Sequence, residues 1–145
     1  VVFAWTGRAA STPELLAGLE RLARERPDVH AERTGEIARL ATELAAAYAD
    51  GARERIVALT DRTGAAMQRL GEAAGLPIVT PEHERLRRLA AGCGGAAKPS
   101  GAGGGDAAVA VFADDEGPRE FAAACRREGF VVLDLAIGAA GLSVP

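Results

Sequence analysis

The sequence is poor in aromatic residues, in histidine and in cysteine. Phe, Trp and Tyr make up 4% of its 145 residues, and it holds 2 His and 2 Cys. A zinc site usually needs four ligands at close spacing, so Cys93 and Cys125, which stand far apart in the chain, do not indicate one. The sequence leaves a disulfide between them open. We expect two buried free thiols, as in a reducing cytoplasm.

Long apolar runs and a large net charge are also missing. No run approaches the roughly 20 apolar residues of a membrane helix. The net charge of -3 gives no electrostatic reason to expect nucleic acid or an anionic membrane as a partner. With 48% hydrophobic and 26% charged residues, the composition is that of a soluble globular domain. We therefore expect one cytoplasmic domain over residues 1–145.

The chain has no initiator methionine and opens directly inside an apolar run, Val1-Val2-Phe3-Ala4-Trp5. That run is too short for a signal peptide and has no basic leader. We expect the chain to be part of a longer protein.

Periodicity and turn signals predict the order strand, four helices, strand, strand, helix, strand. A capping box is expected at Ser11-x-x-Glu14, and Thr34-Gly35 is a possible break in the second helix. The predicted strands are 1–5, 95–98, 107–113 and 130–136. The predicted helices run from Ser11 to Pro27, from near Asp28 to Ala49, from the turn at Asp50-Gly51 to near Gly75, from Thr80 to Gly92, and from the turn at 114–118 to Gly129.

Without the additional helices, this order is β-α-β-β-α-β, the split βαβ pattern of ferredoxin-like folds. The sequence thus predicts an α+β domain, with an antiparallel sheet and extra helices. The run 107–113 is apolar on both faces and should be a central strand covered by helices. We expect the tail, residues 138–145, to be partly disordered.

The most informative stretch is Lys98-Pro99-Ser100-Gly101-Ala102-Gly103-Gly104-Gly105-Asp106. Its glycines can adopt positive φ, which lets successive N–H groups turn toward one anion such as phosphate. Ser100 adds a hydroxyl, and Asp106 could hold a cation or orient the loop. Lys98 could add a positive charge, or be a strand-edge lysine that faces solvent. The alternative is a simple Gly/Ala linker, but the stretch runs unbroken into the predicted strand 107–113, which favours a phosphate-binding loop.

This stretch and its strand resemble the third, C-terminal glycine-rich motif of the GHMP small-molecule kinases. The Gly-Gly-Asp ending is most similar to the phosphomevalonate kinases among them. Ala4-Trp5-Thr6-Gly7-Arg8-Ala9-Ala10-Ser11-Thr12 resembles the strand and turn that open the C-terminal half of bacterial members. The resemblance covers essentially the whole chain, which would be the C-terminal half of such an enzyme. It implies an elaborated ferredoxin-like fold, in agreement with the element order.

The second segment contributes candidate ligands of its own. Thr6, Ser11 and Thr12 could donate hydroxyl hydrogen bonds to a substrate phosphate or carboxylate at a helix N-terminus. Ser11 and Thr12 could equally act only as helix caps. Arg8 could clamp a phosphate or remain a solvated surface residue.

The resemblance implies transfer of the γ-phosphoryl group of ATP to phosphomevalonate, giving diphosphomevalonate in the mevalonate route to isoprenoids. It also implies that ATP and Mg²⁺ are bound mainly by an N-terminal domain, on which this domain would pack. No catalytic residue and no metal ligand is expected in this chain, and neither His30 nor His83 is assigned a catalytic role. The alternatives are another GHMP kinase, a diphosphomevalonate decarboxylase, or a non-catalytic ferredoxin-like module that binds a phosphorylated ligand.

Overall fold

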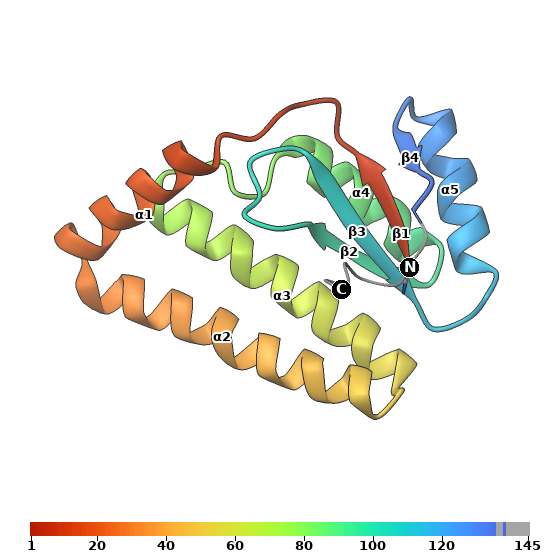
Figure 1. Cartoon of the computed structure of the whole chain (residues 1–145), viewed down its shortest axis with the longest axis horizontal. Helices are drawn as coiled ribbons and strands as arrows, with labels where there is room; N and C mark the ends of the chain where they lie inside the picture. The colour runs from red at the N-terminus through yellow and green to blue at the C-terminus, as the bar shows by residue number, and fades with distance from the viewer. Residues whose placement is uncertain (136–137, 139–145) are drawn as a thin grey trace, which may run out of the picture.

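The computed structural model describes residues 1–135 and 138. Figure 1 shows α1, α2 and α3 on one side of the sheet, α4 behind the strands, and α5 at the end of the molecule opposite α1. No helix in the described residues is long and apolar enough to cross a membrane. In chain order, the elements are β1 (Val2–Trp5), α1 (Thr12–Glu25), α2 (Pro27–Ala49), α3 (Arg53–Ala74), α4 (Pro81–Gly92), β2 (Gly95–Pro99), β3 (Ala107–Phe112), α5 (Gly117–Arg127) and β4 (Val131–Leu133).

The strands form one antiparallel sheet in the order β2-β3-β1-β4. The two central strands pair with Phe3 opposite Val109, and β4 adds to the other side of β1 with Leu133 opposite Phe3. This order results when a β-α-β-β-α-β chain places both crossover helices on one face of the sheet. The predicted α+β, ferredoxin-like fold with extra helices is confirmed.

The first face of the sheet packs against α4 and α5. Its strands present small residues, among them Ala4, Ala108 and Ala110, which are fully or almost fully buried. Small side chains let the helices approach closely, and Leu86 of α4 and Phe121 of α5 fill the space between the layers. These two helices with the sheet form the main core of the domain.

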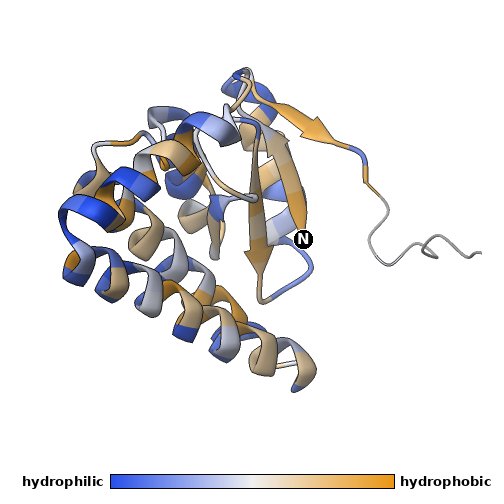
Figure 2. Cartoon of the chain, turned by 60° about the vertical axis from the view of Figure 1, so that its left-hand side comes forward, coloured by the Kyte–Doolittle hydropathy of each residue, from blue (hydrophilic) through white to orange (hydrophobic). Residues whose placement is uncertain are grey.

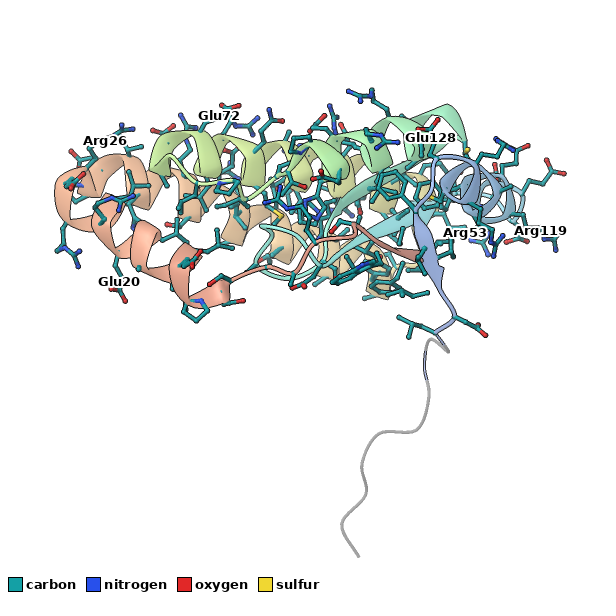
Figure 3. All side chains as sticks on the ribbon, turned by 90° about the horizontal axis from the view of Figure 1, so that it is seen from above. Glu20, Arg26, Arg53, Glu72, Arg119 and Glu128 are labelled. Carbon is teal, nitrogen blue, oxygen red and sulfur yellow. The ribbon has the colours of Figure 1, made fainter. Side chains whose placement is uncertain are left out.

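The other helices cover part of the second face. The antiparallel helices α2 and α3 lie side by side (Figure 1), with Leu40 and Leu59 in their shared core. Helix α3 also packs against β2, and a Cβ on its Gly64 would stand only 3.3 Å from Cβ of Lys98. Helix α1 completes this layer by burying Leu22 against the α3 side. The labelled charged side chain Glu20 of α1 projects outward (Figure 3).

The second face of β1 and β4 has no helix packed on it in the described part of the chain. Side chains opposite one another in the register share this face, namely Phe3 and Trp5 of β1 with Leu133 and Val131 of β4. Val131 is 57% exposed. The hydrophobic colouring of β1 and β4 is visible in Figure 2. An exposed apolar sheet surface of this kind is uncommon on a monomeric protein.

The two cysteines are free thiols, but only one of them is buried as expected. Cys125 is buried in the main core, and burial raises its pKa to about 11. Cys93 is only half-buried, at the end of α4. A thiol with a raised pKa is mostly protonated at neutral pH, so the Cys125 side chain packs in the core as a small apolar group.

Three expectations from the sequence need correction. The predicted capping box at Ser11 is wrong, because its side chain makes no capping hydrogen bond and water can reach the exposed start of α1. The last strand is shorter than 130–136, since β4 pairs only with the short β1. The possible break at Thr34-Gly35 is absent, since α2 is continuous from Pro27 to Ala49, and the Thr34 hydroxyl donates to the His30 carbonyl at 2.7 Å within it. Ala136 and the predicted disorder of residues 138–145 lie outside the described residues, apart from Gly138.

Candidate functional site

The two segments singled out in the sequence lie against each other. The loop between β2 and β3, residues 100–106, which we call the glycine loop, contacts the turn between β1 and α1. The N–H of Thr6 donates to the Asp106 carbonyl, and the N–H of Asp106 donates to the Arg8 carbonyl, each at 2.7 Å. The carboxylate of Asp106 accepts a further hydrogen bond from the N–H of Ala10 at 3.2 Å. Asp106 therefore orients the loop against the turn.

The backbone of the glycine loop adopts conformations that most side chains disfavour. Gly101, Gly103 and Gly104 have φ of 83°, 85° and 80°. A side chain at Gly103 would also collide with the carbonyl group of Ile78. Asp106 itself has φ of 52°, which is uncommon for a residue other than glycine. Strain held by surrounding hydrogen bonds is frequent at ligand sites.

Some amides of the loop are used to build it, and others are left available. The N–H of Gly104 donates to the Ile78 carbonyl at 2.8 Å, and the N–H of Ser100 donates to the Ala107 carbonyl at 2.8 Å. Within residues 1–135, no acceptor is found for the N–H groups of Gly101, Ala102, Gly103 and Gly105. Gly101 and Ala102 are exposed. Unpaired amides on a strained glycine-rich loop are suited to an anion.

A small pocket lies where the loop, the turn and α1 meet. It has a volume of about 170 Å³, and Arg8, Ser11, Glu14 and Gly104 contribute to its walls. The hydroxyl of Ser11 is free of a capping bond, and Arg8 is exposed. These two groups could bind a phosphate at the N-terminus of α1. The carboxylate of Glu14 would repel an anion in this pocket, so anion binding there depends on the positive charge of Arg8.

Lys98 lies on the other side of the loop and does not face open solvent as a strand-edge lysine would. It is half-buried against α3, and its Nζ donates to the Pro99 carbonyl at 3.1 Å. Burial lowers the pKa of Lys98. It shares a pocket of about 550 Å³ with Gly101 and Ala102, and apolar side chains of α1, α2 and α3 form most of its walls. The lysine is thus placed to meet an anionic group beside the exposed loop amides.

Two predicted ligands have other contacts or positions. Thr6 is 5% exposed, and its hydroxyl donates to the Arg8 carbonyl at 3.3 Å, which stabilises the turn. Thr12 is exposed at the first residue of α1. Sequence reasoning missed the carbonyl of Ile78, which holds the loop at Gly104. No residue pattern signals such a backbone contact, because every residue has a carbonyl group.

The described residues contain no cluster of metal-ligating side chains. No group of three or more His, Cys, Asp or Glu side chains comes together among them. Asp106 holds the turn.

The comparisons with known proteins agree with this architecture. Residues 56–131 match the family described as GHMP kinases, C terminal. The chain is 36% identical over 119 residues to a phosphomevalonate kinase of Streptomyces sp. strain CL190. The matched segment makes up 80% of this chain and 31% of that relative. It therefore spans about a third of the length of the relative.

Solved structures share the fold. A Listeria innocua protein superimposes with a TM-score of 0.87 at 24% identity, over 92% of this chain and 38% of that one. The phosphomevalonate kinase of Streptococcus pneumoniae gives a TM-score of 0.72 at 20% identity, with the same coverage of 92% and 38%. The mevalonate kinase of L. major, solved with R-mevalonate, gives a TM-score of 0.73 at 20% identity, over 88% of this chain and 37% of that one. The family match and the Streptomyces relative together show that this chain belongs to the GHMP kinases, as a C-terminal domain of that family.

Proposed function

We propose that this domain is the C-terminal part of a kinase that transfers the γ-phosphoryl group of ATP to phosphomevalonate, giving diphosphomevalonate. Membership of the GHMP kinases supports the phosphoryl transfer. The 36% identity to a phosphomevalonate kinase supports this substrate. The observation that carries the proposal is the glycine loop, whose exposed Gly101 and Ala102 amides have no acceptor within the described chain.

Phosphoryl transfer depends mainly on positioning and on stabilising charge on the transferring group. In the proposed site, the loop amides and Lys98 hold the phosphate of the acceptor substrate. Arg8 and Ser11 line the separate pocket on the α1 side of the loop, and Asp106 keeps the loop in place. ATP enters with Mg²⁺, and both would be bound mainly by a domain outside this chain. The residues of this chain therefore bind and orient and do not supply the nucleotide site.

The uncovered face of β1 and β4 fits the same proposal. The chain covers 31% of its Streptomyces relative and 38% of the Streptococcus pneumoniae kinase. We infer that the rest of the enzyme packs on the face formed by Phe3, Trp5, Val131 and Leu133, which brings the nucleotide site toward the glycine loop. Burying apolar surface stabilises such a contact by about 25 cal/mol per Å².

The test is a substrate panel with the full-length protein. ADP release is measured with phosphomevalonate, mevalonate, homoserine and galactose as acceptors. We expect kcat/KM to be at least about 100-fold higher for phosphomevalonate, because a site built around a phosphate loses several hydrogen bonds with an acceptor that lacks one. Preference for mevalonate would reassign the chain within its family. Phosphate release with carbon dioxide from diphosphomevalonate would indicate the decarboxylase, and binding without turnover of any acceptor would indicate a non-catalytic module.

A further inference from the structure

His83 takes no part in the chemistry above, yet its side chain is only 2% exposed. It is the third residue of α4, and it forms a reciprocal cap with Thr80 at the start of that helix. The N–H of Thr80 donates to Nδ1 of His83 at 3.2 Å, and the N–H of His83 donates to Oγ1 of Thr80 at 3.4 Å. These contacts fix the orientation of the ring.

The cap also determines where the ring carries its proton. Oγ1 of Thr80 also lies 3.1 Å from Nδ1. The buried N–H of Thr80 has Nδ1 as its acceptor, and a ring nitrogen that accepts a hydrogen bond has no hydrogen of its own. We therefore assign the Thr80 hydroxyl as a second donor to Nδ1 and the proton of the neutral imidazole to Nε2. Burial lowers the pKa of His83, and the nearby backbone of Ala107 and Gly105 and the carboxylates of Glu82 and Asp106 oppose this by smaller amounts. The ring is therefore neutral at pH 7, with Nε2–H as a donor.

The ring lies next to the end of the glycine loop. Nε2 is buried and has no hydrogen-bond partner among the described residues. The backbone groups that act on the ring are those of Gly105 and Ala107, on either side of the strained Asp106. The Ala107 carbonyl also accepts from Ser100, which closes the loop. A buried N–H without an acceptor is costly, so a small shift that brings a loop carbonyl onto Nε2 is favourable.

We propose that His83 is a positioning residue for the glycine loop. Its Nε2–H supports the segment from Gly105 to Ala107 from behind and so sets the direction in which the amides of Gly101 and Ala102 face a bound phosphate. The identity of that phosphate rests on the function proposed above. The contact between the imidazole and the loop does not depend on it.

Three variants separate loop support from helix capping. His83→Leu removes both ring nitrogens at similar volume. His83→Gln can replace both contacts, because glutamine is a favoured partner at this position of a capping box and its amide also carries a donor. Thr80→Val removes the cap hydroxyl, with its contacts to the His83 N–H and to Nδ1, but keeps the Thr80 N–H bond to Nδ1 and the Nε2 donor.

The first measurement is independent of enzyme activity. In the full-length protein labelled with ¹⁵N, the imidazole shifts of His83, assigned by their loss in His83→Gln, report the tautomer. We expect a neutral ring at pH 7 that is protonated at Nε2. A ring protonated at Nδ1, or a charged ring, would overturn the proposal even if the protein proves to be a phosphomevalonate kinase.

The second measurement is steady-state kinetics on the same protein. We expect His83→Leu to raise KM for the phosphorylated acceptor about tenfold, the effect of one ordinary hydrogen bond, with KM for ATP within about twofold of the parent value. His83→Gln should return KM for the acceptor to within about threefold, and Thr80→Val should leave it unchanged. Equal effects of His83→Leu and Thr80→Val, or no recovery in His83→Gln, would reduce the histidine to a helix cap. If no acceptor in the panel reacts, the proposed function fails, and the tautomer measurement alone decides the role of His83.

Discussion

At the scale of single residues, Lys98 shows how burial prepares a charged group for a ligand. Its ammonium group is half-buried beside apolar side chains, and the only acceptor found for it among the described residues is a backbone carbonyl. Burial lowers its pKa, so the charged form is less stable in the folded domain than in water. A bound phosphate would compensate that loss of solvation.

Replacement of Lys98 should therefore separate binding from stability. We expect Lys98→Met to raise KM for phosphomevalonate about tenfold through loss of a charge-assisted contact. The variant should be at least as stable as the parent to urea, because an apolar side chain needs no solvation in this pocket. Arg21→Met, at an exposed position of α1, is the control for loss of one charge. An unchanged KM would remove Lys98 from the site.

The same lysine predicts a dependence of stability on pH. In the unfolded chain, Lys98 titrates near 10.4, and in the folded domain its pKa is lower. Between these two values the unfolded state binds more protons, so stability should rise as the pH increases through that window. Urea unfolding at a series of pH values up to about 10.4 should show a steeper rise for the parent than for Lys98→Met. Parallel curves would show that the folded and unfolded pKa values do not differ.

At the scale of secondary structure, the starts of α1 and α4 differ although their sequences look alike. Both have a hydroxyl residue followed by proline, but only Thr80 forms a side-chain cap. Thr80→Val should therefore lower the free energy of unfolding by about 1–2 kcal/mol, and Ser11→Ala by less than about 0.5 kcal/mol. Equilibrium urea unfolding of the full-length protein provides the comparison. Equal losses would mean that Ser11 caps α1 after all.

Sequence patterns predict elements better than they predict contacts between elements. Glycine and proline signals place most helix boundaries correctly, and the fold class follows from the element order. The two segments of the site are also visible, because a run such as Gly103-Gly104-Gly105 is informative by itself. The contribution of Ile78 and the burial of Lys98 depend on how α3 and the α3–α4 connection pack on β2 and the loop. That packing is a tertiary property which no local pattern encodes.

At the scale of the whole molecule, the apolar face of β1 and β4 predicts a covering layer of protein. If the rest of the enzyme packs there, Val131→Lys in the full-length protein should lower the unfolding free energy by about 2 kcal/mol or more, because the new charge would be buried. Ala38→Lys, on the exposed side of α2, should change it by less than about 0.5 kcal/mol. A small effect at Val131 would show that this face is open to solvent.

If the nucleotide site lies on another domain, this domain alone should be inactive. Residues 1–145 produced alone should release no ADP with ATP and phosphomevalonate, since the proposed nucleotide site lies outside them. The full-length protein should be active in the same coupled assay. Turnover by the shorter chain would place the nucleotide site within it.

The central claim is that amides of the glycine loop bind the phosphate of the acceptor substrate. The most direct test compares two glycines with similar backbone conformations, Gly101 with φ of 83° and Gly129 with φ of 80°, neither of which has an atom within 4 Å of an added Cβ. Gly103 is unsuitable, because a side chain there would collide with Ile78. In the full-length protein, Gly101→Ala should lower kcat/KM for phosphomevalonate about 30-fold or more, while Gly129→Ala, which imposes the same strain between α5 and β4, should lower it by less than about threefold. Equal kinetics for the two variants would contradict the claim.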